Sequence, residues 1–166
     1  MNFPNTSETH STSNEKTSYN PPATLQHQFT GDSDYCTHSY KITQEITQTN
    51  ADIVAPSFKE FGKSDREVIL AGFTMEDLKV ANRLGYFSTV RRSALLECGG
   101  YSPRMTWGYE DYHLWFDLFR RGKTIAIIPE ILVMYRVKEK SMLHEANAHA
   151  SELNAQIKKD FPFIFP

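Results

Sequence analysis

Cysteine is scarce in this 166-residue chain, and its two copies, Cys36 and Cys98, are too few for a disulfide framework. No Cys and His spacing matches a zinc site. Long apolar runs are also missing, since no stretch approaches the ~18–20 residues that a membrane span requires. Positive charge is not in surplus, because 18 Lys and Arg stand against 20 Asp and Glu. Nucleic-acid binding needs clustered positive charge, so we expect no nucleic-acid partner.

The N-terminus has no basic segment followed by an apolar one, so no secretory signal is visible. We therefore expect a cytoplasmic location, with the inner membrane surface as a further option. Aromatic residues make up 13% of the chain and hydrophobic residues 40%, which is enough for a packed core. The length fits one domain of ordinary size.

The first fifty residues differ in composition from the rest, because half of them are Ser, Thr, Asn or Gln. Such a segment buries too little apolar area to offset chain entropy. We expect residues 1–31 to be a polar, disordered segment and residues 32–166 to form the domain. Ile42 and Ile46 lie four residues apart, which predicts a short helix from Ser39 to Asn50.

From Ala51 onward, short strands alternate with helices, which predicts an α/β fold with a mixed sheet flanked by helices. Proline is expected to stop the first strand at Pro56 and to divide a later one at Pro129. Expected strands are 52–56, 86–90, 124–128 and 131–137, with shorter elements at 58–63 and 66–71. Expected helices are 74–82, which begins with a capping box, 94–98 capped by Ser93, 110–121 and 141–159.

Two adjacent acids, Glu110 and Asp111, open the most regular helix and follow a loop containing Trp107. Carboxylates at a helix N-terminus lie beside free backbone N–H groups and the positive dipole end, which favours their ionised form. An ionised carboxylate fixed at a cleft edge can accept a proton from a hydroxyl, as a general base does. The alternative is that both acids only complement the helix dipole.

Several short motifs occur here in a specific order, and together they resemble the acceptor-side half of family 2 glycosyltransferases, which have the GT-A fold. The resemblance covers about residues 51–142. The motifs are Ala51-Asp52-Ile53-Val54, Arg91-Arg92-Ser93 with Gly99-Gly100-Tyr101, Gly108-Tyr109-Glu110-Asp111, Arg121-Gly122, Ile128-Pro129-Glu130 and Tyr135-Arg136.

The resemblance implies an inverting transfer of a sugar from a nucleotide-sugar donor to a glycan, lipid or protein acceptor. Asp111 would be the catalytic base, and Glu110 would orient the acceptor or the base. Trp107 and Tyr109 would form a platform for the acceptor sugar, with loop packing as their alternative role.

On the donor side, the resemblance implies that Arg91 and Arg92 contact the diphosphate, with a structural or solvated role as the alternative. A divalent metal, Mn or Mg, would be held by Asp32 and Asp34, which match the spacing of the family's metal motif. The same two aspartates also fit an ordinary turn or cap.

A complete enzyme of this family begins with a nucleotide-binding half, which residues 1–31 are too short and too polar to supply. We therefore expect a truncated enzyme, with two alternatives: a non-catalytic remnant that binds a glycan or a protein, and an unrelated α/β interaction domain whose acids are helix caps. The apolar segment from Phe161 to Pro166 is expected to cover a bare sheet edge. An exposed edge would also favour a partner chain or a homo-oligomer.

Overall fold

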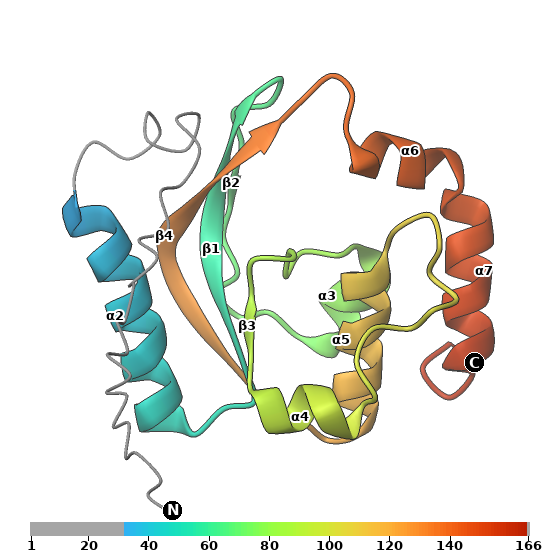
Figure 1. The fold of residues 1–166 in the computed structure, drawn as a ribbon, viewed down its shortest axis with the longest axis horizontal. Coiled ribbons are helices and arrows are strands. Elements are labelled where there is room, and N and C mark those ends of the chain that lie inside the picture. The colour runs from blue at the N-terminus through green and yellow to red at the C-terminus, as the bar shows by residue number, and fades with distance from the viewer. Residues whose placement is uncertain (1–31, 166) are drawn as a thin grey trace, which may run out of the picture.

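The structure is a computed structural model that describes residues 32–165, so the expected disordered segment 1–31 lies outside the described residues. Helices and strands alternate along the chain, as the sequence predicts (Figure 1). In chain order the elements are α2 (Asp32–Thr49), β1 (Ile53–Gly62), β2 (Glu67–Val68), α3 (Met75–Val80), β3 (Thr89–Val90), α4 (Arg92–Glu97), α5 (Glu110–Arg120), β4 (Ile125–Val137), α6 (Met142–Ala148) and α7 (Ala150–Asp160).

The sheet is built around β1, which pairs with all three other strands. β4 runs parallel to β1 along its full length. β3 is antiparallel and pairs with the start of β1, and β2 is antiparallel and pairs with Phe58 and Lys59 in its second half. The start of β1 is fixed by Asp52, whose carboxylate accepts a hydrogen bond of 3.0 Å from the backbone N–H of Thr124. The predicted mixed sheet is therefore confirmed.

Both prolines that were expected to end strands lie inside continuous strands. Pro56 pairs with Ile128, and the next residue, Ser57, pairs with Ile131. Pro129 and Glu130 thus bulge out of the ladder without ending β4. A bulge tolerates proline because the missing N–H is not needed for pairing there. The predicted stop at Pro56 and the predicted break at Pro129 were wrong.

Helices cover both faces of the sheet, with α2 on one face and the remaining helices beyond the other (Figure 1). Side chains of a strand alternate between faces, so neighbouring residues of β1 belong to different cores. Val54 packs with Ile42 of α2, whereas Ile53 and Ala55 belong to the larger core that includes α5. A strand covered on both faces has apolar residues in succession, which explains why β1 shows no alternation.

Local signals placed most helix ends well. Thr74 and Asp77 form the predicted capping box, and Ser141 caps α6 by accepting from the backbone N–H of His144. Two details of the prediction were wrong: Arg91, not Ser93, precedes α4, and the last predicted helix is two helices that meet at His149. Helix α2 also begins earlier than predicted. Among the described helices, none is both long and apolar enough to cross a membrane.

The C-terminal segment packs on α5 and not on a sheet edge, which corrects the prediction. Phe161 is only 3% exposed. Its ring lies 4.7 Å from the His113 ring and 5.8 Å from the Phe116 ring, between centroids. Phe165 also contacts Phe116, at 5.2 Å. The apolar segment is therefore used to complete the core around α5.

Candidate active site

The carboxylate of Asp111, in the first turn of α5, is held by two hydrogen bonds. Helix α5 begins after Tyr109, which has a left-handed backbone (φ 63°) and provides no side-chain cap. Asp111 Oδ2 accepts a hydrogen bond of 3.0 Å from Asn82 Nδ2, and its Oδ1 accepts from the backbone N–H of Tyr112 at 2.7 Å. Asn82 lies just after α3, so tertiary folding brings it to the carboxylate. The sequence predicts a helix end at Asn82 but contains no local signal for this contact.

Burial changes the electrostatics of Asp111. Desolvation raises the pKa of its carboxyl above the ordinary aspartate value, and the hydrogen bonds from Asn82 and Tyr112 offset only part of that effect. The charge of Glu110 raises this pKa further. Desolvation is thus the largest influence on the pKa of this carboxyl. A carboxylate with a raised pKa is a stronger base once it is ionised.

Two tyrosines, Tyr86 and Tyr135, pack together, and the sequence assigned neither of them a role in the site. Burial is the main cause that raises the pKa of Tyr135, and the nearby Tyr86, Glu60 and Asp111 raise it further. The Tyr135 ring lies 6.1 Å from the Tyr86 ring, between centroids, and Tyr86 is 70% exposed. β4 and the loop before β3 thus bring two tyrosines together, and the charge of Asp111 acts on Tyr135. Residue spacing does not predict the contact between Tyr86 and Tyr135, because the two residues come from distant segments of the chain.

The loop before α5 is fastened to the junction of α6 and α7. Trp107 stacks on His149 with ring centroids 4.2 Å apart and planes 8° from parallel, and the indole is 52% exposed. Tyr109 donates through its hydroxyl to Asn147 Oδ1 at 2.9 Å. Both predicted acceptor residues therefore have a structural partner on the C-terminal helices. Their contact with an acceptor stays a prediction.

Gly108 lies between these two aromatic residues and allows the loop to approach α6 closely. A Cβ built on Gly108 would lie 2.7 Å from Ala146 Cβ, and the backbone has φ +128°. We expect Gly108→Ala to lower the free energy of unfolding by about 2–4 kcal/mol, because overpacking adds to left-handed strain. Gly99→Ala is the matched control, since Gly99 has φ +78° and open space around it. Urea unfolding of both variants separates the clash from the strain. Equal losses would contradict the close packing.

The two arginines predicted to face a donor diphosphate differ in their surroundings. Arg91 donates to Asn50 Oδ1 at 3.0 Å and to the Ala51 carbonyl at 3.1 Å, and its Nε lies 3.7 Å from Asp52 Oδ1. These contacts tie α4 to the start of β1, which is a structural role. Arg92 is the exposed first residue of α4. A diphosphate contact by either residue stays a prediction.

The predicted metal ligands, Asp32 and Asp34, are the first and third residues of α2. The family pattern has its aspartates at the end of a strand, so this backbone differs from the expected one. The positions of the two side chains lie outside what the structure describes. Elsewhere in residues 32–165, no group of three or more His, Cys, Asp or Glu side chains is placed to hold a metal ion. The metal site stays a prediction.

Part of the chain is similar to a protein of known sequence. An 86-residue stretch is 31% identical to a protein of Haemophilus influenzae (strain ATCC 51907 / DSM 11121 / KW20 / Rd) named "Uncharacterized glycosyltransferase". The match covers 47% of this chain and 31% of that protein, so it spans about a third of the relative's length. No family model and no solved structure matches the chain. The likeness supports a relation to glycosyltransferases in general, without a particular family or fold.

Proposed function

We propose that this chain carries the acceptor-side part of an inverting glycosyltransferase of the GT-A type, family 2. In this proposal a sugar passes from a nucleotide-sugar donor to a hydroxyl of a glycan, lipid or protein acceptor. The observation that carries it is the Asp111 carboxylate, which is fixed by Asn82 and has a pKa raised by burial. The partial likeness to a protein named a glycosyltransferase supports the same reaction class.

In the proposed step, the acceptor hydroxyl oxygen attacks the anomeric carbon of the donor sugar from the face opposite the leaving group. Asp111 takes the hydroxyl proton as the new C–O bond forms. The bond between the anomeric carbon and the diphosphate oxygen breaks, and the nucleoside diphosphate leaves with the electron pair. One displacement inverts the anomeric centre. Glu110, next to the base in the first turn of α5, would orient the acceptor.

The acceptor would lie against aromatic side chains around this carboxylate. Tyr86 and Tyr135 support this placement, because their rings touch and the charge of Asp111 reaches Tyr135. Trp107 has one ring face on His149 and is half exposed, which leaves indole surface for a sugar. Flat rings favour sugars because their faces bury C–H groups while the hydroxyls stay at the edge.

A divalent metal and a diphosphate contact by Arg92 complete the proposal on the donor side. A metal would stabilise the charge of the leaving diphosphate. Because the first turn of α2 does not reproduce the strand-end setting of the family's metal motif, no step above depends on the metal.

The test is a calorimetric binding panel of UDP, GDP, dTDP and CDP, each with and without Mn²⁺ or Mg²⁺. Saturable binding of one nucleotide, followed by transfer from the matching nucleotide-sugar, is the expected result. Metal-dependent binding that disappears in the Asp32→Asn, Asp34→Asn double variant would place the metal at α2. Failure of every nucleotide to bind would overturn the donor part and favour the alternative of a non-catalytic glycan- or protein-binding remnant.

The pH dependence gives a second test of the base. Only ionised Asp111 accepts a proton, so kcat/KM should rise with pH through its pKa, above the range of an ordinary aspartate. The Asn82 hydrogen bond lowers that pKa, so Asn82→Ala should move the acid limb to higher pH. Asn154→Ala, on an exposed position of α7, is the control and should leave the limb in place. A carbon-13 NMR titration of the Asp111 carboxyl checks the shift without activity. A limb moved to lower pH would contradict the assignment.

A further inference from the structure

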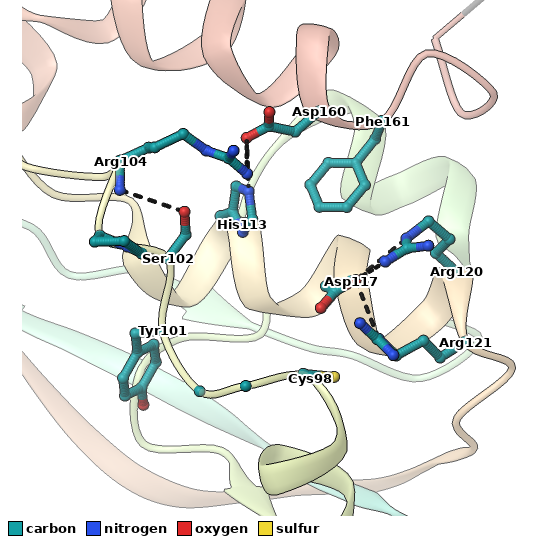
Figure 2. Close-up of a pocket in the computed structure, with 13 residues that line it drawn as sticks. Cys98, Tyr101, Ser102, Arg104, His113, Asp117, Arg120, Arg121, Asp160 and Phe161 are labelled. Atoms are coloured by element: carbon teal, nitrogen blue, oxygen red, sulfur yellow. Dashed lines mark hydrogen bonds and ion pairs between the residues drawn. The ribbon is translucent and has the colours of Figure 1, made fainter.

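A separate cavity of about 310 Å³ lies beside α5, and Asp111 is not among the residues that line it (Figure 2). Its walls are the loop of residues 98–104, the side chains of His113 and Asp117, and the turn at Asp160 and Phe161. Asp117 follows Asp111 by six residues, which places the two positions about 120° apart around the helix. The two carboxylates therefore face different surroundings, and the cavity is not part of the site described above.

Three arginines surround this cavity from two directions. Arg104 reaches it from the loop, and Arg120 and Arg121 reach it from the end of α5, as Figure 2 shows. Arg120 and Arg121 both donate to Asp117 Oδ1, with the Arg121 Nε bond at 3.3 Å. Arg104 Nη2 lies 3.0 Å from Asp160 Oδ2. The arginines are thus held in position by carboxylates that sit deeper in the wall.

The carboxylates of Asp117 and Asp160 each accept several hydrogen bonds. Asp160 Oδ2 also lies 3.0 Å from His113 Nε2, and its Oδ1 accepts from Gln156 Nε2 at 3.0 Å. Burial acts to raise the pKa of Asp117, but the hydrogen bonds and charges of its two arginines outweigh burial and lower that pKa. The carboxylates of Asp117 and Asp160 are therefore both paired with donors in the cavity wall.

The arginines keep capacity for a ligand. Their side chains are 59%, 46% and 37% exposed for Arg104, Arg120 and Arg121. A guanidinium carries five N–H donors, and Arg104 and Arg121 each use one nitrogen in the contacts above. Three positive charges against two negative ones leave a net charge of +1 at the cavity, before any proton on His113 is counted.

We propose that this cavity binds the oxyanion group, phosphate or carboxylate, of a monosaccharide-sized ligand. Arginine suits this role because its planar donors match the oxygens of both groups. The volume is at the lower end of the range for small-molecule sites, about 300–1,000 Å³, which suits one sugar ring with its charged group. The polar wall and the exposed Tyr101 at its edge also suit a sugar. The inference is independent of sugar transfer, since it uses none of the residues around Asp111.

The test measures binding of three probes to the full chain by calorimetry and by amide NMR: glucose 6-phosphate, glucuronate and glucose. We expect at least one of the two anions to bind saturably and to shift amide signals of residues 98–104 and 117–122. Arg104→Gln and Arg121→Gln should each weaken that binding about tenfold, the loss of one charge-assisted contact. Lys140→Gln removes the same charge from an exposed position outside the cavity and should leave binding unchanged.

The pattern of binding separates the sources of the anion. Binding of glucose 6-phosphate alone identifies a phosphate site, and binding of glucuronate alone identifies a carboxylate site. The inference is overturned if neither anion binds, if glucose binds as tightly as the anions, or if the shifted signals lie outside the cavity. An equal loss in Lys140→Gln would also overturn it. Failure of the nucleotide panel would leave this result untouched, because glucose 6-phosphate and glucuronate contain no nucleotide.

Discussion

Sugar transfer is expected to fall by about 10²–10⁴-fold in Asp111→Asn, the range for loss of a general base, while the fold is retained. An asparagine side chain keeps the shape of the carboxylate and an oxygen for the Asn82 amide, but it does not take a proton from a hydroxyl. Rate measurements with the nucleotide-sugar found by the binding panel give the loss in kcat. Circular dichroism and calorimetry of the same sample check the fold.

The difference in folding stability between Asp111→Asn and the parent should depend on pH. Because burial raises the pKa of Asp111 in the folded state, folding stability falls as pH rises from the ordinary aspartate pKa through the raised value. The variant has no charge to desolvate, so above that pH window it should be at least as stable as the parent. Denaturant unfolding at several pH values measures this difference.

Glu110→Gln is the matched control for Asp111→Asn, because it removes the same charge from the same turn of α5. We expect a smaller loss in kcat for Glu110→Gln, together with a rise in KM for the acceptor. If both acids are only caps, each variant should lose about 0.5–1 kcal/mol of stability and transfer should not change. That outcome would contradict the role of base.

The free energy of unfolding is expected to fall by about 3–5 kcal/mol in Phe161→Ala, because a buried ring is replaced by a cavity. Phe161 is 3% exposed and contacts His113 and Phe116 of α5. Urea unfolding measures the loss.

The same segment provides a control of the same residue type. Phe163 is 94% exposed, so Phe163→Ala should change stability by no more than about 0.5 kcal/mol. Equal small losses in the two variants would contradict packing of the C-terminal segment on α5. A loss confined to Phe161→Ala would support that packing.

Helix α5 was predictable because its signals are local. Two acids fill its first turn, and Gly122 follows its end with φ +71°. The capping box at Thr74 was predictable for the same reason, since both of its hydrogen bonds span three residues. Signals of this kind act within one helical turn, and tertiary contacts then strengthen what the sequence already favours.

Strand continuity was not predictable, because the fate of a proline depends on the strand beside it. Pro129 was expected to divide a strand, but the parallel ladder with β1 continues past it through a bulge. The C-terminal segment shows the same limit. Its apolar character indicated that it covers something, but only the position of α7 determined that it packs on α5.

Local sequence patterns were enough to predict that Glu110 and Asp111 begin a helix after an aromatic loop, and that strands and helices alternate along the chain. Tertiary folding, in contrast, determines that Asn82, 29 residues away, donates to Asp111 and that the charge of Asp111 acts on Tyr135. It also determines that desolvation is the largest influence on the pKa of this carboxyl. The reason is physical: backbone hydrogen bonds of a helix form within four residues, whereas desolvation depends on every segment that covers the group.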